Sequence, residues 1–169
     1  LKEILIEEYL QFYNDYKFEI IQTFKLQGKH KIAKQLIYKK STIANSIMNE
    51  DYYATNIDIW LLSKHFKLPI VFFSGTELSE NDKKFLVATK SETESYYFIH
   101  TPGIKNDVPN SYRMVAAPQH KGLIPLNAID SVFSKKLKES IVENPLLDYL
   151  NSVSTLDSTI KLRNKKVKL

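Results

Sequence analysis

The stretch from Tyr52 to Gly75 constrains the fold of this chain most strongly, because a helix signal runs directly into a strand signal. Thr55 or Asn56 is placed to cap a helix that has Asp58 in its first turn, where the helix dipole favours a carboxylate. Pro69 cannot continue a helix, so we expect the helix to end before it.

Apolar side chains surround this predicted helix and fill the strand that follows it. They lie on one side at Ile57, Trp60 and Leu61, and on the other side at Ile59 and Leu62. The run Ile70 to Phe73 is β-branched and aromatic, as interior strands are. The sequence therefore predicts a buried helix and a buried strand at the centre of the core.

Two helical segments are expected before this stretch. From Lys2 to Leu26 apolar residues recur every three or four positions, with Asn14-Asp15 as a candidate break. Gly28 can take the positive φ of a helix end, and a second, more basic helix is predicted from Lys29 to about Asn49. Its predicted core residues are Ile32, Leu36, Ile43 and Ile47, and the lysines expected to face water are Lys31, Lys34, Lys39 and Lys40.

Short strands and further helices are expected after the central stretch. We predict a hairpin of Phe85 to Ala88 with Tyr96 to His100, then a loop from Thr101 to Asn110 and a strand from Tyr112 to Val115. A helix follows, with a buried face made of Leu126, Ile129, Val132, Phe133, Leu137 and Ile141. A short last helix is predicted from Asn144-Pro145 to about Leu150. Helices, then strands, then helices is an α+β order. We expect a small, mostly antiparallel sheet packed against helices.

Length and composition support one domain with a tail. With 169 residues, 43% of them hydrophobic, the chain can bury a single sizeable core. We predict one globular domain over residues 1–150 and a Ser/Thr-rich, then basic, tail or linker over residues 151–169.

The net charge of +5 comes from the end of the chain. The basic residues there are Lys161, Arg163, Lys165, Lys166 and Lys168, and no acid stands among residues 161–169. The rest of the chain has as many basic as acidic side chains, 19 of each. A short basic tail can contact phosphate, so nucleic acid stays open as a partner although the body is neutral.

The sequence lacks the signals of thiol enzymes, secreted proteins and membrane proteins. The chain has no Cys, which excludes thiol chemistry within these residues and fits a reducing compartment. Charged residues interrupt the first ten positions, whereas a signal peptide needs an uninterrupted apolar segment. No run approaches the roughly 18 apolar residues of a membrane helix. We expect a cytoplasmic or virion location, no secretion and no membrane partner.

Neither a metal nor a cofactor is expected. The four histidines, His30, His65, His100 and His120, lack the spacing of a zinc site. The four glycines are dispersed instead of forming a phosphate-binding loop, and the Gly-x-Ser-x-Gly motif of serine hydrolases is absent. Glu50, Asp51 and Asp58 are interpreted as a helix cap with exposed acidic neighbours.

The order of elements resembles the central part of the ovarian-tumour (OTU) type of papain-like cysteine protease. In that family an aromatic-bearing loop precedes a helix with an acidic residue and a Leu-Ala or Leu-Ser pair, and a strand beginning near Pro-Ile follows. The matching positions here are Tyr53, Asp58, Leu62-Ser63 and Pro69-Ile70-Val71. Tyr96 to His100 resembles the penultimate strand of the family, and Tyr112 to Val115 resembles the segment after its catalytic His.

The resemblance covers roughly Leu5 to Val115 and implies an OTU/papain-like core. The stretch also resembles uncharacterised proteins of large DNA viruses, and this resemblance implies one domain of a longer viral polypeptide. The family nucleophile is a Cys in an Asp-Gly-x-Cys box at a helix N-terminus, and no Cys is present here. Ser111 precedes Tyr112 where the family has its His, and a serine hydroxyl cannot accept a proton near neutral pH.

The resemblance therefore implies a catalytically inactive OTU-like domain that acts as a structural or protein-interaction module. Ser111 and Tyr112 would be degenerate-site positions, and His100 is the remaining candidate for a displaced base. Tyr53, Asn110 and Tyr112 are candidate binding residues, with ubiquitin or other subunits of a larger assembly as the protein partner. Two alternatives stay open: an active deubiquitinase whose Cys helix precedes Leu1, and a nucleic-acid-binding module that uses the basic helix and tail.

Overall fold

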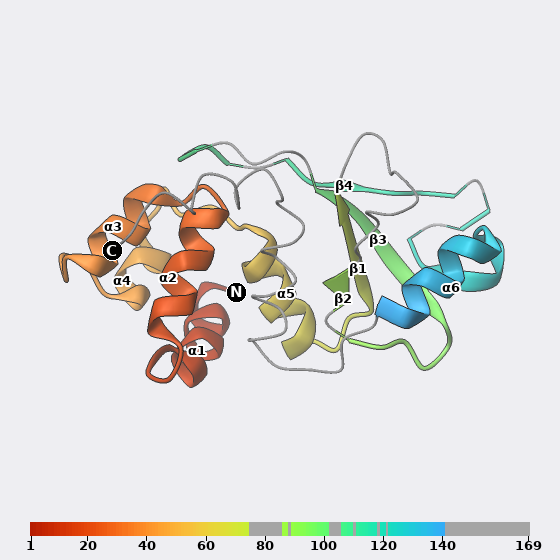
Figure 1. The fold of residues 1–169 in the computed structure, drawn as a ribbon, viewed down its shortest axis with the longest axis horizontal. Helices are drawn as coiled ribbons and strands as arrows, with labels where there is room; N and C mark the ends of the chain where they lie inside the picture. Colours follow the sequence, from red (N-terminus) through yellow and green to blue (C-terminus); the bar gives the residue numbers. More distant parts are fainter. Residues whose placement is uncertain are drawn as a thin grey trace.

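The computed structural model describes residues 1–74, 86–87, 89–101, 106–109, 111–117, 119–120 and 122–140. In chain order the elements are α1 (Lys2–Tyr13), α2 (Lys17–Leu26), α3 (His30–Ile37), α4 (Ile43–Met48), α5 (Asn56–His65), β1 (Ile70–Ser74), β2 (Leu86–Val87), β3 (Ser95–Thr101), β4 (Arg113–Met114), β5 (Ile124–Pro125), the 3₁₀ turn η1 (Leu126–Ala128) and α6 (Ser131–Ser140). Helices and a small mixed sheet make up the fold (Figure 1), which confirms the predicted α+β class.

Helices α1 to α5 gather in one half of the molecule, and the sheet lies beside α5 (Figure 1). Helix α6 lies beyond the sheet, at the opposite end of the molecule from α3 and α4. Helix α5 packs against α1 on the helical side and contacts β1 on the sheet side. Trp60 in α5 is only 3% exposed, so α5 is the buried junction between the two halves.

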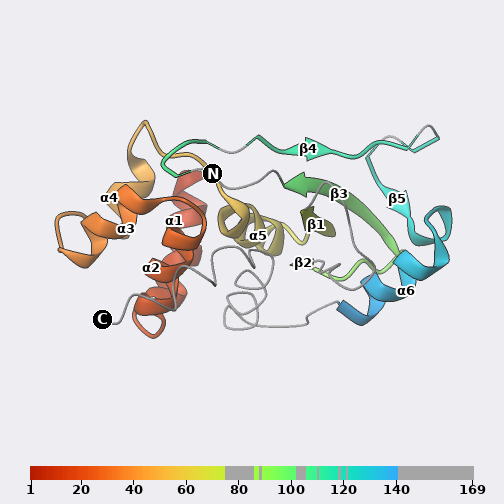
Figure 2. The same ribbon diagram turned by 45° about the horizontal axis from the view of Figure 1, so that its top comes forward.

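The sheet has the strand order β2-β1-β3-β4, and β5 pairs with β3 outside this path. Strands β1 and β3 are parallel, with Ile70 opposite Tyr97 and Ser74 opposite Thr101. The other pairings are antiparallel. Figure 2 shows β4 along the outer edge of the sheet. The sheet is therefore mostly antiparallel by number of pairings, although its longest pairing is parallel.

Alternation along the strands directs successive side chains into two cores on opposite faces of the sheet. Ile70 belongs to the core of the helical half, and Tyr97 and Ile99 pack against that core. The second core consists of Val71, Tyr96, Phe98, Ile124, Leu126 and Leu137. Strands β1 and β3 thus need apolar residues on both faces, which explains why their sequences do not alternate between apolar and polar.

The predicted central helix and strand are confirmed. Thr55 is the N-cap of α5, and Asp58 completes a capping box with it. The helix ends before Pro69, and β1 begins at the next residue. The break predicted at Asn14-Asp15 separates α1 from α2, and Gly28 has the expected positive φ of 80°.

The single helix predicted from Lys29 to Asn49 is wrong, because this segment forms two helices, α3 and α4. Between them Lys39 has a φ of 54°, which a continuous right-handed helix does not allow. The hydroxyl of Thr42 then accepts a hydrogen bond from the Asn45 backbone N–H at 3.1 Å and caps α4.

The predicted hairpin between residues 85–88 and 96–100 is also wrong. Strand β2 pairs with β1, with Val87 opposite Val71, and β3 pairs with β1 in parallel. These pairings bury side chains in both cores, and a turn signal in the local sequence does not reveal them.

Val132, predicted on a buried helix face, is 59% exposed in the first turn of α6. Residues 141–150 and the tail over residues 151–169 lie outside the described residues.

Within the described part of the chain, no helix has both the length and the apolar character needed to cross a membrane.

Candidate functional site

Asp58 is the centre of a buried polar group of side chains that we call the Asp58 cluster: Tyr9, Lys29, Tyr52, Thr55 and Asp58. The side chain of Asp58 is 0% exposed. Its Oδ2 atom accepts hydrogen bonds from the Thr55 backbone N–H at 2.7 Å and from the Thr55 hydroxyl at 3.1 Å. The capping role predicted for Asp58 is therefore confirmed, but the same carboxylate has further partners.

Lys29 supplies the opposite charge from the turn between α2 and α3. Gly28 ends α2, and the Lys29 backbone N–H donates to the Phe24 carbonyl at 2.8 Å, which directs the Lys29 side chain inward. Its Nζ atom lies 2.5 Å from Asp58 Oδ2, and both side chains are completely buried. An unpaired buried charge is very unfavourable, so each residue needs the other to be buried here.

Two tyrosine hydroxyls complete the Asp58 cluster. Tyr9 and Tyr52 donate to Asp58 Oδ1 at 2.7 and 2.6 Å. The Tyr52 hydroxyl also accepts a hydrogen bond from Lys29 Nζ at 2.8 Å. The ammonium lies 4.0 Å from the Tyr52 ring centroid and 5.1 Å from that of Phe24, within the range of cation–π attraction. The carboxylate thus accepts five hydrogen bonds from four residues of the helical half.

Burial shifts the titration of this cluster. It lowers the pKa of Lys29, because the charged ammonium is disfavoured away from water, and the nearby Asp58 carboxylate offsets part of that effect. Burial raises the pKa of Tyr52 well above its ordinary value, and the negative charge of Asp58 adds to the rise. Tyr52 therefore stays neutral around the ion pair at physiological pH.

A pocket of about 440 Å³ lies over the Asp58 cluster, between α3, α4 and the segment that leads to α5. We call it the α3–α4 pocket. Lys29 and Tyr52 of the cluster are among its lining residues, and α3 and α4 contribute amide, hydroxyl and apolar side chains. Two lysines and two aspartates, Lys31, Lys40, Asp51 and Asp107, also line it.

Tyr53, one of the three predicted binding residues, lies in the wall of this pocket. Its hydroxyl is buried and has no hydrogen-bond partner within the described residues. Burial raises the pKa of Tyr53, and the charges of Asp107 and Asp58 act in the same direction. A buried hydroxyl normally has a hydrogen-bond partner, so the Tyr53 hydroxyl is an exception among the described residues.

Asp107 lines one side of the pocket, and we call Asn106 and Asp107 the α3-capping loop. Asp107 Oδ1 accepts from the Lys31 backbone N–H at 2.9 Å, and the Asp107 backbone N–H donates to the Gly28 carbonyl at 2.6 Å. His30 Nε2 lies 3.0 Å from Asn106 Oδ1. The first turn of α3 is therefore capped by a segment 76 residues later in the chain.

The other predicted site residues lie elsewhere. His100 in β3 pairs with Arg113 in β4, and Ser111 and Tyr112 directly precede Arg113 in the chain. Ser111 is exposed and Tyr112 is partly buried. Outside the described residues lie Asn110 and the basic tail residues Lys161, Arg163, Lys165, Lys166 and Lys168.

The described residues contain no group of three or more His, Cys, Asp or Glu side chains that could hold a metal ion. His65 contacts Glu8 instead, with 2.8 Å between Nδ1 and Oε1.

No protein-family model, curated protein or solved structure matches this chain. Asp58 accepts hydrogen bonds from α1, from the segment before α5 and from the start of α5, and pairs with the turn before α3. This arrangement holds the helical half together and shapes the floor of the pocket.

The sequence pattern does not reveal Lys29 as the partner of Asp58. Lys29 lies in a segment whose lysines are predicted to face water, and it is 29 residues away from Asp58 in sequence. Its position directly after the helix-ending Gly28 was the one local signal that set it apart from the other lysines.

Proposed function

We propose that this chain is a non-catalytic, OTU-like domain that acts as a structural or protein-interaction module of a larger, viral protein. The observation that carries this proposal is the Asp58 cluster. The acid that matches the acidic position of the protease family is buried, ion-paired and saturated with five hydrogen bonds. A carboxylate in this state stabilises the fold and is not available to orient a catalytic base.

Two features of the sequence support the same proposal. The 169 residues contain no Cys to act as the nucleophile of such a protease. Ser111, which stands where the family has its His, is exposed and follows an Asn in a segment between two strands. A serine hydroxyl at that position cannot act as a general base near neutral pH.

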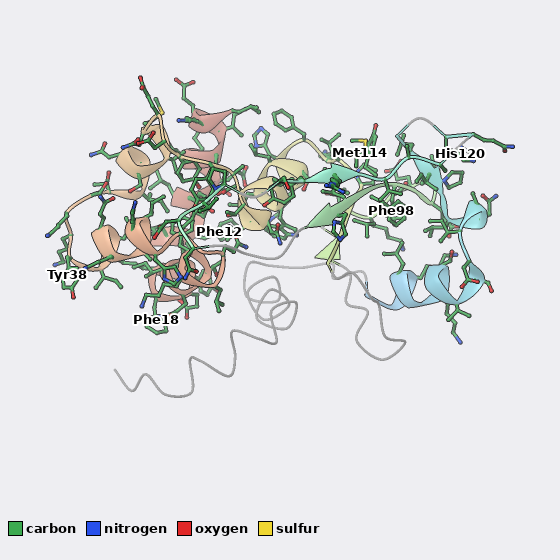
Figure 3. The ribbon with its side chains drawn as sticks, turned by 90° about the horizontal axis from the view of Figure 1, so that it is seen from above. Phe12, Phe18, Tyr38, Phe98, Met114 and His120 are labelled. Carbon is green, nitrogen blue, oxygen red and sulfur yellow. The ribbon has the colours of Figure 1, made fainter. Side chains whose placement is uncertain are left out.

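A surface on α2 and α3 is the candidate for protein binding. We call it the α2–α3 surface and define it by Lys17, Phe18, Lys34, Tyr38 and Lys39. Phe18 is 58% exposed and Tyr38 is 63% exposed, and both lie at the periphery of the helical half, Tyr38 at its outer end and Phe18 along its lower edge in the view of Figure 3. Helices α2 and α3 pack against each other, and the three lysines are exposed. Exposed aromatic residues among lysines fit a protein segment with apolar and acidic side chains.

Binding of a designed peptide tests this surface. The probe is a 15-residue helical peptide with leucines on one face and glutamates elsewhere, and the control peptide has lysines in place of the glutamates. We expect the acidic peptide to bind and the basic peptide not to bind, as measured by calorimetry. Phe18→Ala with Tyr38→Ala should weaken binding at least tenfold, because each loses a large aromatic contact.

Val132→Ala is the matched control, since Val132 is equally exposed but lies on α6. Ubiquitin, the partner that the resemblance implies, is titrated in parallel. Equal binding of both peptides, or no effect of the double substitution, would reject the α2–α3 surface as a protein-binding site.

Nucleic-acid binding is the second candidate, and the exposed Phe18 and Tyr38 beside lysines favour it, because bases stack on such rings. A 20-nucleotide single-stranded RNA distinguishes this candidate. Binding of the RNA alone, with affinity that falls steeply as salt increases, would replace the protein-binding proposal.

A further inference from the structure

Strand β4 is the outer strand of the sheet on the side away from β1. The strand order ends at β4, and Figure 2 shows β4 along the upper margin of the molecule with no described element above it. Arg113, Met114, Val115 and Ala116 are all exposed. An exposed edge strand can pair with a strand of another chain through the backbone groups that point outward.

The hydrogen bonds to β3 show which backbone groups of β4 point outward. The Val115 backbone N–H donates to the Phe98 carbonyl at 2.9 Å, so Val115 and Phe98 form a hydrogen-bonded pair. In an antiparallel ladder such pairs alternate with pairs that are not hydrogen-bonded. Met114 and Ile99 are the next pair in the register, so the N–H and C=O of Met114 point away from β3.

The side chains around Met114 limit what can pair with this edge. Met114 is 60% exposed and Val115 is 38% exposed. Arg113 is the one charged residue between Ser111 and Ala117. Edge strands are usually protected by several charged residues, a bulge or a proline. The edge of β4 instead presents apolar side chains, a single positive charge and no acid.

A second copy of the same chain complements this edge. In an antiparallel pairing with a two-fold axis at Met114, the N–H of each Met114 donates to the C=O of the other. Arg113 then stands opposite Val115 of the partner subunit, so the two positive charges do not face each other, and the two methionine side chains cover each other. A strand of another protein would add at most an exposed ion pair with Arg113, which contributes little.

We infer that β4 is a self-association site, at which two copies of the chain pair antiparallel about Met114 and join their sheets into one. This site is separate from the α2–α3 surface, whose residues lie in α2, in α3 and just after α3. Because the contact is short, the dimer is expected to be weak, with a dissociation constant of about 10 µM to 1 mM.

Sedimentation velocity of the purified chain, from about 5 µM to about 2 mM, tests the dimer. Met114→Lys and Met114→Glu each place like charges opposite each other across the axis, so each should weaken self-association about tenfold or more. An equal mixture of the two variants should associate again, because each lysine then faces a glutamate. Met48→Lys is the matched control, since Met48 is 53% exposed but lies on α4.

A change in the backbone tests the same pairing without a charge. Met114→Pro removes the outward N–H, and an edge strand tolerates proline where that N–H faces solvent. The variant should therefore keep the thermal stability of the chain and stay monomeric. Met114→Lys, which changes an exposed side chain, should also keep the thermal stability.

Three outcomes would overturn the inference. The first is a chain that is still monomeric at about 2 mM, above the expected range. The second is a dimer that neither Met114→Lys nor Met114→Pro weakens, or a mixture of Met114→Lys and Met114→Glu that associates no better than either variant alone. The third is a monomer whose Met114 amide shifts by NMR when an extended peptide of alternating threonine and valine is added, which would assign the edge to a strand of another protein.

Discussion

At the scale of single residues, Lys29 and Asp58 form the most consequential contact in the described structure. Their side chains are fully buried and 2.5 Å apart. Such a pair need not stabilise the fold more than a well-packed apolar pair does, but the loss of one partner leaves the other charge buried and unpaired. The sequence predicted the cap at Asp58 from local pattern. It could not predict Lys29, because the pairing depends on how the turn after α2 packs against α5.

The first prediction concerns Asp58→Asn. This change removes the charge but keeps the shape, and it leaves Lys29 buried without its counter-ion. We expect the free energy of unfolding to fall by about 3–5 kcal/mol, as measured by urea denaturation. Asp51→Asn, at an exposed carboxylate of the same pocket, should change it by less than about 0.5 kcal/mol. Similar values for the two variants would show that the ion pair is not needed.

The second prediction concerns alkaline pH. The folded pKa of Tyr52 is raised above its ordinary value of 10.0, so its contribution to stability is present below pH 10.0 and is lost as pH rises further. The lowered pKa of Lys29 acts in the opposite direction as pH rises through its unfolded value of 10.5, and this effect is present in the unmodified chain and in Tyr52→Phe alike. Between about pH 10.5 and 11.5, the free energy of unfolding should fall less steeply with pH in Tyr52→Phe than in the unmodified chain. The two slopes should differ by up to about 1.4 kcal/mol per pH unit.

Urea denaturation at several pH values measures this slope. Tyr38→Phe, at an exposed hydroxyl, should keep the slope of the unmodified chain. An unchanged slope in Tyr52→Phe would contradict the burial of the Tyr52 hydroxyl against Asp58.

At the scale of elements, helix ends position the site. Gly28 ends α2 with a φ of 80°, and the residue after it enters the Asp58 cluster. The sequence predicted this break, the break at Asn14-Asp15 and the cap at Thr55, because each has a local chemical signal. It did not predict the end of α3, where Lys39 takes a positive φ without being Gly or Asn.

The third prediction concerns Gly28→Ala. An alanine in the left-handed region is strained, so we expect a loss of about 1–2 kcal/mol in the free energy of unfolding. Gln11→Ala, on an exposed face of α1, should have little effect. No loss of stability in Gly28→Ala would show that the turn can adopt another backbone conformation.

The fourth prediction concerns the α3-capping loop. Asp107→Ala removes the acceptor for the Lys31 backbone N–H. We expect a loss of about 0.5–2 kcal/mol, the usual effect of removing a cap, and faster hydrogen exchange in the first turn of α3. Asn106→Ala is the comparison, since it removes only the exposed contact with His30. Unchanged exchange at Lys31 in Asp107→Ala would contradict the capping role.

At the scale of the whole molecule, a sheet with two apolar faces separates two cores. The α+β class could be predicted from the order of helical and strand patterns. The strand pairing could not, because β1 and β3 are brought together by burial on both faces and not by a turn between them. The α3–α4 pocket was likewise hidden from sequence, since its wall combines segments from α3, α4 and the α3-capping loop.

Asp58, the acid that matches the protease pattern, is buried in the fold, and we propose that the domain binds protein without cleaving it. The most direct test incubates the purified chain with ubiquitin chains and with a ubiquitin probe that carries a reactive C-terminal electrophile. We expect the ubiquitin chains to stay intact and no covalent adduct to form, because these residues contain no thiol and Asp58 already accepts five hydrogen bonds. Cleavage of the ubiquitin chains by the unmodified protein, with loss of that cleavage in His100→Ala, would contradict this expectation.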